Sequence, residues 1–430
     1  MHFNTLLKHT IVWKMINTLL VFFINLIMVR LLGVAASGSF FYDITVLSFM
    51  ILVLSWCLES GITYYASRNN NLIASILLFI LPLLMIQALT GVVALRYTRL
   101  TVSSFLALLF IVSNLSIIYF SAFFYAKKWF ISLNIITCCI NFVTTVILFF
   151  LWYAKPLNAV NKNYYQQVYI VSIALLACIL IAVILIGTKG NRRLFAKSLS
   201  AAKDVFKYSS IAFLSNVLFF LVIRIDYFFV QQYCSNAALS NYIQVSKFGQ
   251  LLILVPSIIG SLVFPYSAGN NAVMTVDKVQ QLCRAITLIF IPVTAIIILT
   301  AYWILPWIFG AGFNLMYIAL LLYLPGFFAL SIVTVLAAHL GGKKMLKDNL
   351  IAAFMALVLV VTGDVLLIPA GGINAAAAVS SVGYMACAMY LLWVFKVKFN
   401  TNAGAFFSIK KQEIKYIVSH CKKIIIPSIQ

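Results

Sequence analysis

The chain has 430 residues, of which 64% are hydrophobic and only 9% are charged, and its mean hydropathy is +1.09. This composition excludes a set of soluble domains and is typical of an integral membrane protein. Thirty basic and eight acidic residues give a net charge of +22, which in a soluble protein would indicate a nucleic-acid partner. Here the charges lie in short connectors between apolar runs, so no nucleic acid is expected.

Twelve apolar runs are long enough to span a bilayer as helices. They cover residues 11–31, 41–62, 72–95, 101–125, 130–153 and 165–187, then 209–231, 242–264, 284–305, 315–338, 349–369 and 373–395. The sequence therefore predicts an all-α integral membrane protein with about twelve transmembrane helices. We expect an N-terminal six-helix half at 1–190, a basic linker at 191–208, a C-terminal six-helix half at 209–398 and a basic tail at 399–430.

Charges in the connectors predict which side of the membrane each connector faces. Twenty-three basic residues fall on the side that holds both termini and the segment 188–207, and five fall on the other side. Basic residues accumulate in short cytoplasmic loops, so both termini are predicted to be cytoplasmic. The first apolar run is too long for a cleavable signal peptide and lacks a small-residue cleavage site, so none is expected.

The C-terminal tail carries apolar residues at helical spacing among lysines. These are Phe406, Phe407, Ile414, Ile417, Val418 and Cys421. The pattern indicates a basic amphipathic helix on the inner leaflet, and a disordered basic tail is the alternative. In either case the tail lies outside the predicted spans, so deletion from residue 405 is expected to leave them folded.

Charged residues inside the spans are the strongest functional signal. Arg224 and Asp226 lie in the run 209–231, and Lys247 lies in the run 242–264. Each buried charge costs about 2.5–3.5 kcal/mol on insertion scales, so such residues usually face an interior or a watery cavity. Because residues two apart on a helix point roughly opposite ways, Arg224 and Asp226 are expected to have different partners.

One face of the run 209–231 forms a polar and aromatic stripe at helical spacing. Its members are Ser209, Phe213, Asn216, Phe220, Arg224, Tyr227 and Gln231. The polar members could serve as helix–helix contacts. A purely structural arginine at this depth is costly, which favours an anionic ligand for the stripe.

Four passages resemble those of a known transporter family. They are MVRLLGVAASGSFFY, RIDYFFVQQYCSNAALSNYIQVSKFGQLLILVPSIIGSLVFPYSA, FGAGFNLMYIALLLYLPGFFAL and LLIPAGGINAAAAVSSVGY. Their order and spacing resemble the polysaccharide-biosynthesis flippases of the O-antigen (Wzx) type, in the multidrug/oligosaccharidyl-lipid/polysaccharide (MOP) exporter superfamily. The chain departs from the family at Leu239-Ser240-Asn241-Tyr242, where relatives often have Leu-Gly-x-Tyr.

The resemblance implies a fold with two six-helix halves around a central cavity. It also implies a flippase that moves an undecaprenyl-diphosphate-linked oligosaccharide across the bacterial inner membrane by alternating access. The cargo would be an O-antigen, capsule or exopolysaccharide repeat unit. Membrane lipids and polysaccharide polymerase machinery would be partners, and no cofactor is implied, with H⁺ or Na⁺ coupling left open.

A diphosphate crossing hydrocarbon needs a cationic and polar path. The candidate substrate-binding residues are therefore Arg224, Lys247, Arg30, Asn216, Asn25 and Gln231. Asp226, Glu59 and Asp364 are candidates for ion coupling or for a structural role. The eight cysteines and the histidines show no metal-ligand spacing, so no metal site is expected.

Three alternative functions remain open from the sequence. A peptidoglycan precursor flippase would need the same cationic path. A multidrug exporter of the same superfamily would favour buried carboxylates, of which the N-terminal half has only Asp43 and Glu59. An enzyme such as an O-antigen polymerase would need a large outer loop, and the longest outer connector, about 154–164, is too short for a catalytic domain. The sequence therefore predicts a transporter that is not an enzyme.

Overall fold

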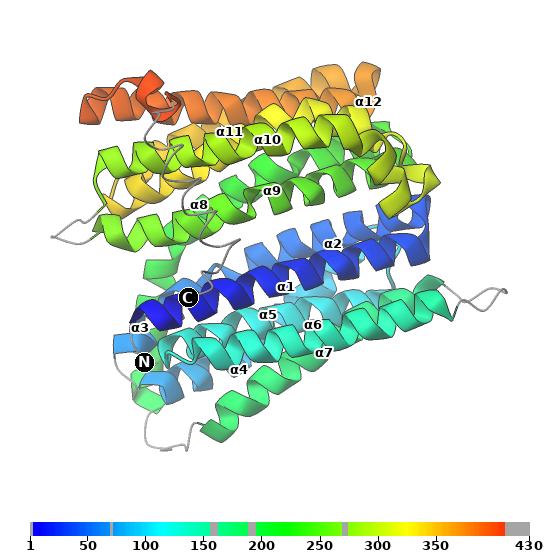
Figure 1. Cartoon of the computed structure of the whole chain (residues 1–430). Coiled ribbons are helices and arrows are strands. Elements are labelled where there is room, and N and C mark those ends of the chain that lie inside the picture. Colours follow the sequence, from blue (N-terminus) through cyan, green and yellow to red (C-terminus); the bar gives the residue numbers. More distant parts are fainter. Residues whose placement is uncertain (1–2, 69–71, 155–161, 188–194, 269–273, 409–430) are drawn as a thin grey trace, which may run out of the picture. The chain divides into compact units, whose positions relative to one another are not determined.

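The computed structural model describes residues 3–68, 72–154, 162–187, 195–268 and 274–408. Throughout these ranges the regular structure is helical (Figure 1). The helices are α1 (Phe3–Leu32), α2 (Val34–Ser55), α3 (Leu58–Arg68), α4 (Leu72–Arg96), α5 (Ser104–Ala126), α6 (Phe130–Tyr153), α7 (Lys162–Gly187), α8 (Phe195–Tyr233), α9 (Asn236–Ala268), α10 (Val276–Phe309), the 3₁₀ turn η1 (Ala311–Phe313), α11 (Met316–Gly342), α12 (Leu346–Phe399) and η2 (Ala403–Phe406).

Eleven of the described helices are long and apolar enough to cross a membrane. One of them, α12, has 54 residues, which would make a straight helix of about 80 Å, more than twice the hydrocarbon core. Its backbone is non-helical at Gly372, with φ 57° and ψ −143°, a conformation that side chains with a Cβ avoid. This break falls between the two predicted runs 349–369 and 373–395. The predicted fold class, an all-α membrane protein of about twelve spanning helices, is confirmed.

The predicted second span, 41–62, is wrong in its boundaries. In the structure α2 begins at Val34 and ends at Ser55, and the separate helix α3 follows. Trp56 and Cys57 between them both have positive φ, 48° and 52°, which breaks the helix. Tertiary contacts hold this turn: the Trp56 ring stacks on Phe213 at 4.2 Å, and its Nε1–H donates to Ser210. Hydropathy does not detect such a break, because both turn residues are apolar.

The described helices form two compact units. Unit 1 comprises Met1–Gln244 and Pro306–Leu315, and unit 2 comprises Val245–Leu305 and Met316–Gln430. These two units are defined by their compactness. They do not test the predicted six-helix halves, 1–190 and 209–398, which stay a prediction. Each unit is built around one deeply buried helix.

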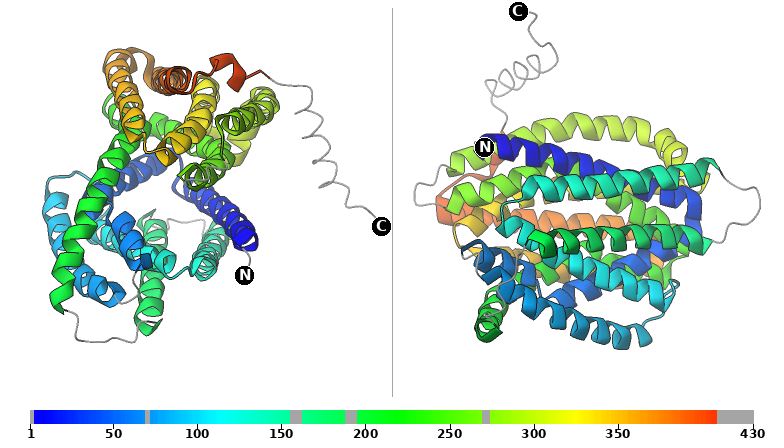
Figure 2. Two further views of the ribbon diagram at one scale, coloured as in Figure 1. Left: turned by 90° about the vertical axis from the view of Figure 1, so that its left-hand side faces the viewer. Right: turned by 90° about the horizontal axis from the view of Figure 1, so that it is seen from below.

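In unit 1 the central helix is α5. It packs against α2, α3, α4, α6 and α7, and the side chains of Tyr119, Phe120 and Phe123 are fully buried. The long helices of this unit run side by side (Figure 1, Figure 2). The carboxylate of Asp43 accepts hydrogen bonds from the backbone N–H groups of Thr101 and Val102, just before α5 begins. Asp43 therefore holds the α4–α5 turn.

In unit 2 the central helix is α11, which packs along α12. Gly326 on α11 lies against Ser381 on α12, and a Cβ at Gly326 would come within 2.7 Å of the Ser381 Cα. The two helices can approach this closely only because position 326 has no side chain. At one end of the unit, His339 contacts Ser267 at 2.8 Å and packs on the rings of Phe395 and Phe399.

The segment 400–408, here called the strap, corrects the predicted start of the surface tail. Phe406 is fully buried and packs edge-on against Phe395 at 5.5 Å. Arg284 Nη1 donates to the carbonyl of Ala405 at 2.6 Å. The strap is therefore part of the packed unit, and deletion from residue 405 would remove a core side chain. The rest of the predicted amphipathic helix, 409–430, lies outside the described residues.

Candidate functional site

The second half of α8 places Arg224 and Asp226 on one membrane-spanning helix. Arg224 is half-buried, and its Nη1 donates to the hydroxyl of Tyr227, one turn along the helix. The guanidinium carbon lies 4.9 Å from the centre of the same ring, which is within the range of a cation–π contact. Tyr227 itself is fully buried. Because the Tyr227 ring is buried, its contacts restrict the orientation of the Arg224 guanidinium.

Asp226 belongs to the same cluster but faces other partners. It is fully buried, and its Oδ1 accepts a hydrogen bond from the Tyr227 backbone N–H at 2.9 Å. Its Oδ2 accepts from the hydroxyl of Tyr242 at the start of α9. The rings of Tyr227 and Tyr242 meet edge to face at 5.7 Å. Hydrogen bonds to a buried carboxylate offset its desolvation, so Asp226 ties α8 to α9.

Two aromatic members of the predicted stripe, Phe213 and Phe220, pack on α2 and on the turn that follows it. Phe213 stacks on Trp56, and Phe220 lies 5.4 Å from Phe49. Asn216 is exposed, and its side-chain amide donates to the sulfur of Cys57 at 3.2 Å. Much of this face of α8 therefore makes helix–helix contacts, the structural alternative considered for the stripe.

Arg30 donates hydrogen bonds to backbone carbonyls at the C-terminal end of α10. Its Nε donates to the carbonyl of Ile308 at 2.7 Å, and its Nη2 donates to the carbonyl of Trp307. Both acceptors lie in the last turn of α10, where carbonyls have no partner within the helix and the helix dipole favours a cation. Arg30 thus caps α10, a role that its place in the sequence did not indicate.

The remaining polar candidates make local or neighbouring contacts. The Asn25 amide donates to Val21 in its own helix at 2.7 Å. Gln231 donates to the side chain of Asn236 at 3.3 Å, while its buried Oε1 has no hydrogen-bond partner among the described residues. In unit 2, Lys247 is half-buried on α9 and Asp364 is fully buried in α12.

Glu59 lies in the first turn of α3, beyond the end of the second span. Its Oε2 is buried and accepts no hydrogen bond from the part of the chain that the structure describes. Burial raises the pKa of the Glu59 carboxyl above its ordinary value. The Glu59 carboxyl therefore holds its proton more tightly than an exposed glutamate does.

The structure therefore gathers some of the predicted residues and separates others. Arg224 and Asp226 meet through Tyr227. Arg30 and Asn216 bind to other elements of unit 1, and Asn25 donates to its own helix. The sequence did not indicate the roles of Tyr227 and Tyr242. The available signal was Tyr227, which lies within one turn of two charged residues inside a span. Among the described residues, no three His, Cys, Asp or Glu side chains come together as metal ligands.

Comparison with known proteins shows that this chain is similar to several solved structures in its fold. No family model matches the sequence, and no curated protein matches it. The lipid II flippase MurJ in an inward closed conformation is similar at 15% identity and a TM-score of 0.67, over 92% of this chain and 88% of that one. An inward-facing multidrug resistance MATE family transporter of the MOP superfamily is similar at 14% identity and a TM-score of 0.67, over 91% and 98%.

A third similar structure is a MOP superfamily transporter from Pyrococcus furiosus, at 14% identity and a TM-score of 0.62, over 92% of this chain and 94% of that one. At such low identities these matches show that the chain has the fold found in MurJ and MATE transporters. They extend over nearly the whole chain and therefore include both units.

Proposed function

We propose that the chain is a flippase that moves an undecaprenyl-diphosphate-linked oligosaccharide across the bacterial inner membrane. The cargo is an O-antigen, capsule or exopolysaccharide repeat unit. One observation carries the proposal: a chain with the fold seen in a lipid II flippase holds a half-buried arginine within a spanning helix, braced by a buried tyrosine. An arginine at membrane depth is costly unless an anion meets it, which supports an anionic cargo.

The chemistry of Arg224 suits a diphosphate. A guanidinium presents planar paired donors that match two phosphate oxygens, whereas an ammonium offers a point charge. Tyr227 restricts the orientation of Arg224 before any ligand arrives, which lowers the entropy lost on binding. Lys247 in unit 2 supplies a second cation within a span. Asn216, Asn25 and Gln231 are the polar groups proposed to contact the same cargo.

Arg30 enters this proposal indirectly. Its two hydrogen bonds hold the end of α10, so we assign it a positioning role in unit 1 in place of direct contact with phosphate. Alternating access of the two halves is driven in this proposal by H⁺ or Na⁺, with Asp226, Glu59 and Asp364 as candidate coupling residues. Both termini face the cytoplasm, and the polysaccharide polymerase machinery receives the flipped product.

Observations on the acids weigh against one of the two other cargoes, the cationic drugs of a multidrug exporter. A multidrug exporter for cationic compounds needs carboxylates that can meet a cation. Here the carboxylate of Asp43 is engaged by Thr101 and Val102, and that of Asp226 by Tyr242. Glu59 lies in α3, beyond the end of the second span. These positions favour an anionic cargo. A peptidoglycan precursor carries the same diphosphate, and the likeness to MurJ keeps it as the second candidate.

Complementation separates these candidates. The chain is expressed in a strain that lacks its O-antigen flippase and in a strain depleted of its lipid II flippase, with membrane levels quantified in both. Restored surface polysaccharide in the first strain alone is the expected result. Rescue of the second strain alone would identify a peptidoglycan precursor flippase. Drug resistance with neither rescue would overturn the flippase proposal.

A further inference from the structure

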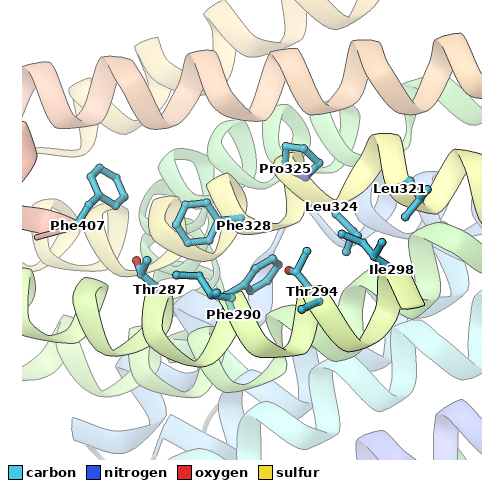
Figure 3. Close-up of a pocket in the computed structure, with 11 residues that line it drawn as sticks. Thr287, Phe290, Thr294, Ile298, Leu321, Leu324, Pro325, Phe328 and Phe407 are labelled. Atoms are coloured by element: carbon cyan, nitrogen blue, oxygen red, sulfur yellow. The ribbon is translucent and has the colours of Figure 1, made fainter. Parts of the chain in front are cut away.

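A groove of about 690 Å³ runs between α10 and α11 in unit 2 (Figure 3). The side chains that line it are apolar apart from two threonines, and the hydroxyl of Thr287 donates to the carbonyl of Cys283 in its own helix. These walls hold no group that would select one occupant. In unit 1, by contrast, buried polar atoms on α9 lack the partners that their burial requires.

Gln244 is a buried amide on α9 whose donor group is unused. The residue is 1% exposed, and its Nε2 has no hydrogen-bond partner among the described residues. A buried donor without a partner carries its whole desolvation cost, so such groups are rare in folded proteins. An apolar side chain of the same size would pack at this position without that cost. The donor therefore has a partner that the packed helices do not supply.

Asn241 holds an unused acceptor three residues earlier on the same helix. It is fully buried, and its Nδ2 donates to the carbonyls of Ala237 at 2.8 Å and Gly312 at 3.1 Å. Carbonyls only accept, so these two bonds fix the orientation of the amide, and its Oδ1 is left with no partner in the part of the chain that the structure describes. Residues three apart on a helix have Cβ atoms about 5–6 Å apart. The unused acceptor and the unused donor can therefore meet one small ligand.

The two amides select a ligand that carries hydroxyl groups. A hydroxyl both donates and accepts, so it can donate to Asn241 Oδ1 and accept from Gln244 Nε2. Neither amide is charged, so the two give no preference to an anion or to a cation. A sugar ring has hydroxyls on neighbouring carbons and offers several such groups. The cargo of the proposed flippase is built from sugar rings.

Gln244 also lies beside a proposed diphosphate contact on α9. Ser240, Gln244 and Lys247 are spaced i, i+4 and i+7, so they share one face of the helix. The rise from Gln244 to Lys247 is about 4.5 Å, which is comparable with the width of one sugar ring. A sugar attached to a diphosphate at Lys247 would therefore reach Gln244.

The two amides are closed off in this structure. The hydroxyls of Ser37 on α2 and Ser240 on α9 lie 2.7 Å apart. A Cβ at Gly38 would overlap the carbonyl oxygen of Asn236 at the start of α9, so the two helices meet with no space between them. A ligand reaches the amides only after α9 separates from neighbours such as α2.

We propose that Asn241 and Gln244 bind the sugar next to the diphosphate of the cargo, in a state in which α9 has separated from α2. The inference rests on the proposed function and adds a sugar contact to it. The two amides recognise hydroxyl positions and not charge, so they contribute to the choice among sugars, while Arg224 and Lys247 contact the diphosphate. The partner of the unused donor is then a sugar hydroxyl, which is absent when the helices are closed.

The affinity of the purified full chain for three lipids tests this sugar contact. Undecaprenyl diphosphate is compared with the same lipid carrying glucose and with the same lipid carrying N-acetylglucosamine, by native mass spectrometry in detergent. One hydrogen bond changes an affinity by about fivefold, so at least one sugar-bearing lipid should bind at least about fivefold tighter than the bare diphosphate. Gln244→Met keeps the size of the side chain and should lower this preference about fivefold. The control Gln250→Met, at an exposed amide on the same helix, should keep it.

The thermal stability of the lipid-free protein separates a sugar contact from a structural amide. Because the buried donor of Gln244 has no partner, Gln244→Met should raise Tm by a few degrees. An amide that holds a structural water would lose those bonds on substitution, and Tm would fall. A fall in Tm, or a sugar preference that survives in Gln244→Met, would overturn the proposal. Gln244→Leu replaces Gln244→Met if that variant does not fold.

The same titrations keep this inference apart from the proposed function. A chain that binds the bare diphosphate without any sugar preference would overturn the sugar contact and leave the flippase proposal standing. A chain that binds none of the three lipids would contradict both. An equal loss of sugar preference in the Gln250→Met control would also overturn the assignment to Gln244.

Discussion

The cap on α10 predicts that Arg30 stabilises the fold and does not bind cargo directly. Arg30→Met keeps the length of the side chain and removes both donors to Trp307 and Ile308. A hydrogen bond from a charged donor contributes about 1.5–3 kcal/mol, and a cation at a helix C-terminus about 0.3–1 kcal/mol. Because Arg30 is partly exposed, we take the low end, about 2 kcal/mol in total.

Such a loss is measurable as a change in thermal stability. For a domain of 150–250 residues it corresponds to a fall in Tm of about 4–8 °C. Thermal unfolding of the detergent-purified protein measures it, with Arg99→Met as the control, because Arg99 is an exposed arginine in the α4–α5 connector. Arg30→Lys should fall between the two. The reasoning is refuted if Arg30→Met leaves Tm unchanged and abolishes transport, since that combination indicates contact with cargo.

Three further predictions follow from buried groups in each unit. Tyr242→Phe removes the hydroxyl donor to Asp226 and should lower the free energy of unfolding by about 1.5–3 kcal/mol; an unchanged denaturant midpoint would show that the bond is dispensable. A chain that ends at Ser408 should keep the Tm of the full chain, whereas one that ends at Asn402 should lose several degrees, and equal Tm values would place the strap outside the folded core. Burial raises the pKa of Glu59 above 4.5, so the folded state holds the proton more tightly and stability falls as pH rises through that pKa. Glu59→Gln should therefore raise Tm at pH 7 and leave it unchanged near pH 4, and a difference independent of pH would contradict this assignment.

Most of the fold was predictable because hydrophobic length determines where a helix can cross a membrane. The break at Gly372 was also predictable, since proline and paired glycines mark a turn. The break after Ser55 was not, because Trp56 adopts a positive φ for tertiary reasons: its ring stacks on Phe213, far away in the sequence. Composition does not encode such a contact.

The candidate site was predictable in its charges and much less so in their partners. Arg224 and Asp226 were identified because an ionised side chain in a span is costly. The cap formed by Arg30 joins residues 277 positions apart, and no local pattern reports that pairing. Residue 284 begins a predicted span, and nothing in the local sequence indicates the contact of Arg284 with the strap, which depends on how residues 400–408 fold back.

The affinity of the purified protein for undecaprenyl diphosphate tests the central claim most directly. Losing the charged hydrogen bonds of Arg224 should weaken binding at least about tenfold in Arg224→Gln, with Arg224→Lys in between. The Tm of Arg224→Gln should also fall by a few degrees, because its hydrogen bond to Tyr227 is lost, so binding is measured at a temperature at which both variants are folded. A Kd for Arg224→Gln within twofold of the unchanged protein, with the fold intact, would contradict the assignment of Arg224 as the diphosphate contact.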